Sequence, residues 1–162
     1  MPHLTLEYSA NLRNFSELTR LCQALARVLV AQQDDGRPVY PIGGVRVRAI
    51  VADNYCIGDG RFQDAAFVHA ILKIGAGRSD AVRKATGDAL FDAMKSHFAR
   101  ESAAQGLALS LEIVEFSEGG TWKQNNLHAR FAAPGRGVGP VPPAAPVPPR
   151  TPADPATPDL NA

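Results

Sequence analysis

The sequence has no charge excess of either sign and no long apolar run. Its 162 residues include 17 lysines and arginines against 16 aspartates and glutamates, which gives a formal net charge of +1 at pH 7. A protein that grips nucleic-acid backbone usually carries a basic surplus or a basic stripe, and this sequence has neither. No apolar run approaches the roughly 20 residues that a transmembrane helix needs. We therefore expect no nucleic-acid partner and no membrane span.

Cysteine is scarce, and the start of the chain does not resemble a secretion signal. The two cysteines, Cys22 and Cys56, have no metal-ligand spacing with any of the four histidines. The first residues, Met1-Pro2-His3-Leu4, show no basic stretch followed by an apolar one. The sequence therefore predicts a cytoplasmic protein with reduced thiols and no bound metal.

Proline is concentrated at one end of the chain. Ten of the 13 prolines fall in residues 134–162, a segment without aromatic residues. Such a segment cannot bury enough apolar surface to offset the entropy of ordering its backbone. We predict a folded domain over residues 1–133 and a disordered Pro/Ala-rich tail over residues 134–162. The run Pro146-Val147-Pro148-Pro149-Arg150 resembles a polyproline ligand, although a solvated extension is the favoured interpretation.

A strand–helix–strand pattern occurs twice in the predicted domain. Strand alternation covers residues 4–8, 45–51, 66–74 and 107–113, and helical spacing covers residues 18–29 and 82–98. This order predicts an α+β fold: a β-α-β repeat that forms a four-stranded sheet with two helices on one face. The other face would be uncovered in a monomer. Its apolar residues predict that the sheet packs on other subunits.

The histidines give little indication of a site. His69 falls in an apolar strand, and His97 falls on the apolar stripe of the second helix. We expect both side chains to belong to the core. No Ser/His/Asp or Cys/His arrangement is recognisable in the sequence.

Pro2 is a candidate catalytic base. Removal of the initiator methionine before a small residue would leave a secondary amine at the chain end. An α-amino group has a reference pKa of about 7.7–8.0, and burial or a neighbouring cation lowers that value. Such a nitrogen can act as a general base near neutral pH. A Met-Pro start without functional consequence is the more common case.

A glycine-rich segment offers a candidate anion site. Residues 73–79, KIGAGRS, end a strand with two glycines, where the backbone can approach a ligand, and then enter a helix N-terminus. Arg78 adds a forked donor that suits carboxylate or phosphate. The alternative is a strand-to-helix turn that needs glycine for its backbone angles alone.

A second pair of arginines lies within a predicted strand. Arg46 and Arg48 project from the same strand face, because side chains alternate along a strand. They could form a second carboxylate clamp, or they could pair with Glu7 and Glu112 on a solvated face. The alternation alone does not decide between these interpretations.

Six motifs, in order, together resemble one family. They are residues 2–4 (PHL), 44–48 (GVRVR), 67–69 (FVH), 73–79 (KIGAGRS), 109–113 (LSLEI) and 123–126 (KQNN). Each motif alone is weak evidence for a family. Together and in this order, over residues 2–131, they resemble the 5-carboxymethyl-2-hydroxymuconate Δ-isomerases of the tautomerase superfamily. The tail lies outside this resemblance.

The resemblance implies an assembly, an activity and a site. Family members form homotrimers and isomerise an unsaturated tricarboxylate in homoprotocatechuate degradation, without a metal or an organic cofactor. Carried over residue by residue, Pro2 is the catalytic base, and Arg46 and Arg78 are catalytic residues that also bind substrate. Arg48 and Gly77 are further substrate-binding candidates.

The implied reaction converts 5-carboxymethyl-2-hydroxymuconate to 5-carboxymethyl-2-oxo-hex-3-ene-1,6-dioate by proton transfer through the N-terminal proline. Two alternatives remain at this point. One is a related tautomerase of a smaller 2-hydroxydienoate such as 2-hydroxymuconate. The other is a non-catalytic trimeric binding protein.

Overall fold

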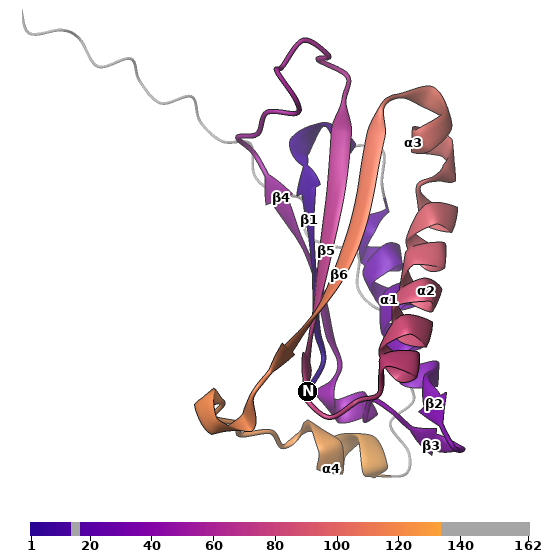
Figure 1. Cartoon of the computed structure of the whole chain (residues 1–162), viewed down its shortest axis with the longest axis vertical. Helices are drawn as coiled ribbons and strands as arrows, with labels where there is room; N and C mark the ends of the chain where they lie inside the picture. The colour runs from indigo at the N-terminus through magenta and orange to yellow at the C-terminus, as the bar shows by residue number, and fades with distance from the viewer. Residues whose placement is uncertain (14–16, 134–162) are drawn as a thin grey trace, which may run out of the picture.

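The computed structural model of the protein describes residues 1–13 and 17–133 (Figure 1). The segment 134–162, for which the sequence predicts a tail, lies outside the described residues. Within the described ranges, no helix is both long and apolar enough to cross a membrane. The same residues contain no group of three or more His, Cys, Asp or Glu side chains placed to hold a metal ion.

Two strand–helix–strand units follow each other along the chain, as predicted. The first consists of β1 (His3–Ser9), α1 (Leu18–Ala31) and β4 (Arg46–Ala52), and the second of β5 (Ala66–Gly75), α2 (Asp80–His97) and β6 (Leu107–Phe116). Shorter elements are η1 (Ala10–Leu12), β2 (Gln33–Asp34), β3 (Arg37–Pro38), η2 (Ile42–Gly44), α3 (Ala99–Ala104), η3 (Glu118–Gly120) and α4 (Leu127–Ala132).

The four long strands form one mixed sheet with the order β4-β1-β5-β6. Each unit contributes a parallel pair, β1 with β4 and β5 with β6. The two units meet through the antiparallel pair β1 and β5. They therefore run in opposite directions, and β1 begins at an inner position of the sheet between β4 and β5.

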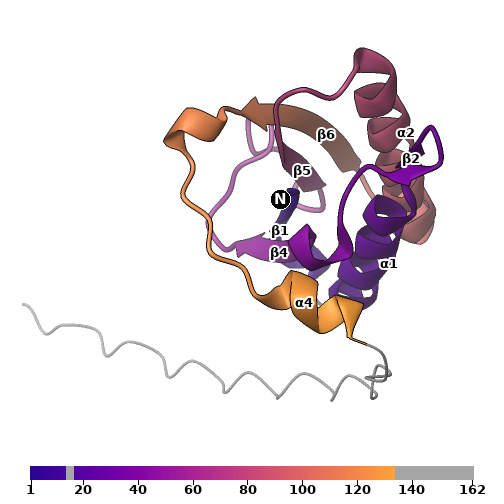
Figure 2. The same cartoon turned by 90° about the horizontal axis from the view of Figure 1, so that it is seen from below.

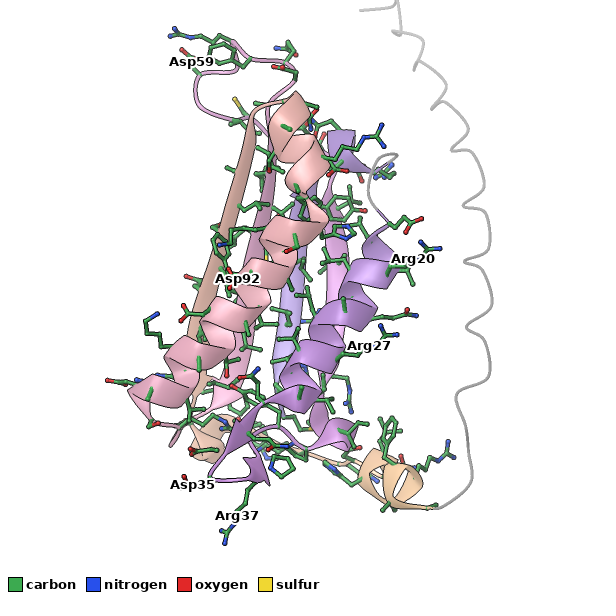
Figure 3. All side chains as sticks on the ribbon, turned by 90° about the vertical axis from the view of Figure 1, so that its right-hand side faces the viewer. Arg20, Arg27, Asp35, Arg37, Asp59 and Asp92 are labelled. Atoms are coloured by element: carbon green, nitrogen blue, oxygen red, sulfur yellow. The ribbon has the colours of Figure 1, made fainter. Side chains whose placement is uncertain are left out.

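Both long helices cover the same face of the sheet (Figures 1 and 3). Alternate residues of the central strands are fully buried under the helices, namely Leu4, Leu6, Val68, Ala70, Leu72 and Ile74. The helices contribute Leu21, Leu25, Leu29, Leu90 and Met94 to the same core. Burial of each such large side chain is worth about 1.5–3 kcal/mol, so this layer supplies most of the stability of the domain.

The segment between β3 and η2 also enters the core. Tyr40 is fully buried, and its hydroxyl donates a hydrogen bond of 3.2 Å to Oγ1 of Thr86 on α2. On α2, Thr86 therefore faces the core, and the neighbouring Ala85 is exposed. Ser79 caps the N-terminus of α2, since its Oγ accepts a hydrogen bond from the Val82 N–H at 3.3 Å.

No helix of the described chain covers the opposite face of the sheet, which we call the open face. Its apolar members include Ile50 and Val114, which are 49% and 38% exposed. His69 lies on this face and not in the core, so that prediction is wrong. Its Nδ1 lies 2.7 Å from Oγ of Ser110, and its Nε2 lies 3.8 Å from Oε1 of Glu112. The reason is that β5 carries apolar residues on both faces, so alternation did not show which face His69 occupies.

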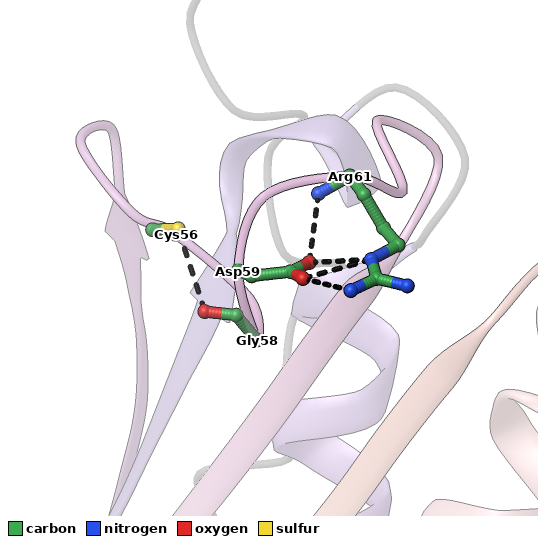
Figure 4. A network of polar contacts seen from close by, with 4 residues as sticks. All are labelled: Cys56, Gly58, Asp59 and Arg61. Atoms are coloured by element: carbon green, nitrogen blue, oxygen red, sulfur yellow. Dashed lines mark hydrogen bonds and ion pairs between the residues drawn. The ribbon is translucent and has the colours of Figure 1, made fainter.

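The loop of residues 53–65 lies at the end of the sheet away from the chain start (Figure 1). It contains a local polar network in which Arg61 binds the carboxylate of Asp59 (Figure 4). Hydrogen bonds from Arg61 hold the pKa of Asp59 below its usual value. The exposed Cys56 thiol lies 3.9 Å from the Gly58 carbonyl in the same network. This network shares no residue with the site described next.

Candidate active site

Pro2 is buried at the end of the sheet where the chain begins (Figure 2). Its carbonyl accepts a hydrogen bond of 3.1 Å from the backbone N–H of Arg46, which fixes it against the start of β4. Met1 precedes it, so the Pro2 nitrogen is part of a peptide bond in this chain. That nitrogen becomes an amine only when Met1 is removed.

The carbonyl of Gly43 holds the arginine next to Pro2. It accepts a hydrogen bond from Nη1 of Arg46 at 3.1 Å and a second one from Nδ2 of Asn125 at 2.9 Å. Nη1 of Arg46 also donates to the Val45 carbonyl at 3.0 Å. Arg46 is therefore turned back toward η2, and a residue far away in the sequence stabilises this arrangement.

The segment that carries Asn125 passes across this end of the sheet and continues into α4 (Figure 1). Oδ1 of Asn125 accepts a hydrogen bond from the Leu127 N–H at 2.9 Å, and Nδ2 lies 3.5 Å from Sδ of Met1. A Cβ on Gly43 would lie 2.8 Å from the backbone nitrogen of His128. The α4 backbone thus packs directly on Gly43, and glycine is required there for this close approach.

A cavity of about 310 Å³ lies beside the chain start. Its lining comes from all four strands and from the segment after β6, and consists of Met1, His3, Arg48, Lys73, Phe116, Thr121 and Lys123. In the β1–β5 pairing, His3 stands directly opposite Lys73. Arg48 approaches from β4, on the other side of β1. Nζ of Lys123 lies 5.7 Å from the centre of the Phe116 ring.

The cavity is electropositive. Three of its lining residues, Arg48, Lys73 and Lys123, have cationic side chains, and none of the lining residues that the structure describes is a carboxylate. Burial lowers the pKa of His3, and the positive charges of Arg48, the chain amino group and Arg46 lower it further. The same field favours a bound anion and an unprotonated amine at this position.

The structure brings three of the predicted site residues together and leaves two apart. Pro2, Arg46 and Arg48 lie at the chain start. Arg78 lies outside the cavity, with its guanidinium 5.2 Å from the centre of the Tyr40 ring and Nη1 2.6 Å from the Gly75 carbonyl. Gly77 is exposed with a φ of 102°, a backbone conformation that favours glycine.

Four residues near Pro2 were not assigned a role from the sequence, namely His3, Lys73, Lys123 and Asn125. Each lies within a motif that carried the family resemblance, so a signal was present in the sequence. No spacing rule singled them out, because they come from three separate segments of the chain. Only the tertiary fold shows that their side chains share one site.

Comparisons with known proteins agree on one family. The family model described as 5-carboxymethyl-2-hydroxymuconate isomerase matches residues 2–131. An Escherichia coli protein, 5-carboxymethyl-2-hydroxymuconate Delta-isomerase, is 40% identical over 131 residues, which are 81% of this chain and 99% of that protein.

Solved structures give the same result. A 5-carboxymethyl-2-hydroxymuconate isomerase from Deinococcus radiodurans R1 is 51% identical with a TM-score of 0.75, and the match covers 82% of this chain and 95% of that one. A 5-carboxymethyl-2-hydroxymuconate delta-isomerase is 33% identical with a TM-score of 0.76, over 84% of this chain and 96% of that one.

Proposed function

Because this chain belongs to the 5-carboxymethyl-2-hydroxymuconate isomerase family, and is an isomerase of the tautomerase superfamily, we propose that it acts on 5-carboxymethyl-2-hydroxymuconate. The product is 5-carboxymethyl-2-oxo-hex-3-ene-1,6-dioate. One observation carries the proposal: the buried Pro2 lies between Met1 and His3, which line a cavity whose described lining includes three cationic side chains and no carboxylate. Such a cavity suits a small substrate with several carboxylates.

In the proposed mechanism Pro2 moves a single proton. After removal of Met1, the free secondary amine takes the proton of the substrate 2-hydroxyl group, and the electron pair of that O–H bond enters the conjugated system. The resulting dienolate spreads its charge from the 2-oxygen to carbon 5. The prolinium then returns the proton to carbon 5, which leaves a 2-oxo group and a double bond between carbons 3 and 4. No metal or organic cofactor takes part.

The electrostatics of the site support this role for Pro2. Arg48 and Arg46, whose positive charges contribute to the lowered pKa of His3, also lie beside the chain start, and they disfavour a protonated amine there. They favour the dienolate for the same reason, since preorganised cations stabilise negative charge that develops during the reaction. One group of side chains would thus activate the base and stabilise the intermediate.

We assign the arginines as follows. Arg46 is anchored through Nη1 alone within the described residues, so its remaining N–H groups can bind the substrate. Arg48 lines the cavity and can bind a carboxylate. Arg78 and Gly77 lie outside the cavity of their own chain, so a role in binding requires a rearrangement or a neighbouring chain that brings them to a site.

We propose that the chain works as a homotrimer. The open face of the sheet exposes apolar side chains such as Ile50 and Val114 in the single chain. Covering this face by other copies would bury that surface, and the resemblance to a trimeric family implies the same assembly. Sedimentation equilibrium of the purified protein tests this: a mass of one chain would contradict it.

The activity is tested with purified protein whose intact mass shows that Met1 is absent. We expect turnover of 5-carboxymethyl-2-hydroxymuconate to exceed that of the dicarboxylate 2-hydroxymuconate. Equal or better turnover of the dicarboxylate would refute the proposed substrate. Pro2→Ala should lower kcat by at least about a hundredfold, the size typical of a lost general base. If Met1 stays attached and the protein is still fully active, Pro2 is not the base.

A further inference from the structure

Lys73 extends from β5 into the cavity at the chain start. It stands opposite His3 across the antiparallel β1–β5 pair, so its side chain begins about 5 Å from that of His3. Since His3 directly follows Pro2, the ammonium group of Lys73 can reach the region next to the proposed base. Arg48 approaches the same region from β4, so the two cations lie on either side of β1.

Neither cation has an acidic partner among the described residues. The ion pairs of the described chain join other residues and include neither Arg48 nor Lys73. The cavity lining also includes Lys123, and the part of it that the structure describes contains no carboxylate. Arg48 and Lys73 have like charges and no acidic partner among the described residues, which disfavours the folded state, so this pair favours an anionic ligand.

We propose that Lys73, together with Arg48, binds the carboxymethyl carboxylate of the substrate and so determines the preference for a tricarboxylate. This inference rests on the proposed function. Pro2 returns its proton to carbon 5, and the carboxymethyl group is attached to that carbon. When carbon 5 faces Pro2, the carboxymethyl carboxylate lies beside the chain start, where Lys73 and Arg48 converge. The dicarboxylate 2-hydroxymuconate has no group at this position.

The test is substrate discrimination by Lys73→Met. Loss of one charge-assisted hydrogen bond should raise KM for the tricarboxylate about ten- to a hundredfold. KM for 2-hydroxymuconate should stay within about twofold, since that substrate does not use the subsite. Lys73→Arg should restore most of the discrimination because it keeps the charge. Lys95→Met, on the outer surface of α2, is the matched control and should change neither KM.

Parallel loss with both substrates, or no loss with either, would overturn the role of Lys73. Binding of propane-1,2,3-tricarboxylate, measured by calorimetry on the wild-type protein and on Lys73→Met, separates this inference from the proposed function. If the wild-type protein does not isomerise the tricarboxylate substrate, the proposed function is refuted. If Lys73→Met then still binds propane-1,2,3-tricarboxylate more weakly than the wild type does, the subsite is supported. Isomerisation by the wild type together with equal binding by both proteins would refute the subsite alone.

Discussion

Replacing Gly43 by alanine tests whether contact with α4 holds the turn next to Pro2. A Cβ at this position would lie 2.8 Å from the backbone nitrogen and from Nδ1 of His128, and 2.9 Å from its Cα. Carbon atoms do not approach so closely without a shift of one partner. Two of the three contacts involve backbone, so a rotamer change of His128 cannot relieve them.

The size of the effect follows from what must move. Overpacking of this kind costs about 1–3 kcal/mol. No residue of α4 is fully buried, so the helix can shift at limited cost, and we expect a loss near 1–2 kcal/mol. The Gly43 carbonyl also binds Arg46 and Asn125, so the shift displaces both. We expect kcat/KM to fall about tenfold, which corresponds to roughly 1.4 kcal/mol of transition-state stabilisation.

Gly44→Ala is the matched control in the same turn. A Cβ on Gly44 would have its nearest neighbours at 3.6–3.7 Å, which is ordinary van der Waals contact. Both substitutions reduce the conformational entropy of the unfolded chain by the same amount. The difference between their unfolding free energies therefore reports the cost of the added Cβ in the native state. Urea unfolding followed by circular dichroism, at one protein concentration, gives the stability, and steady-state kinetics gives kcat/KM. Equal values for the two variants would refute the close packing of α4 on Gly43.

Two further predictions concern the core. Tyr40→Phe removes the hydrogen bond to Thr86 and should lower the unfolding free energy by about 1 kcal/mol. Adding Thr86→Val should recover most of that loss, and an additive loss in the double variant would contradict the reasoning. Burial lowers the pKa of His97, so below its ordinary value of 6.5 the folded chain binds fewer protons than the unfolded one and loses stability as the pH falls. His97→Gln should therefore reduce the fall in Tm between pH 7.5 and pH 5.5, with a remainder from His3, and an unchanged fall would show that His97 does not contribute.

Local patterns were sufficient to predict the layered part of the fold. Alternation in β1 and β6 and the helical spacing of α1 and α2 depend on neighbouring residues, and they predicted both units and the open face. The strand β5 is apolar on both faces, because one face packs on the helices while the other still carries Phe67 and Ile71. Alternation therefore could not place His69, and its predicted core position was wrong.

The candidate site could be predicted only in part. The resemblance pointed to Pro2 and Arg46, which lie together at the chain start. The role of Asn125 depends on a hydrogen bond to Gly43, a residue 82 positions earlier in the chain. The direction of Arg78 depends on the aromatic face of Tyr40, which no local spacing indicates. Contacts of this kind arise from tertiary packing, so the sequence pattern alone does not contain them.

The opposite directions of the two β-α-β units have a consequence for the number of reactive centres. β1 and β5 occupy equivalent places in their units, but only β1 follows a chain end, while β5 continues from the loop of residues 53–65. Under the proposed mechanism, the duplicated unit that begins with β5 therefore supplies no amine equivalent to that of Pro2. Each chain would then supply one base, at the end of the sheet where β1 begins, while the loop of residues 53–65 lies at the opposite end.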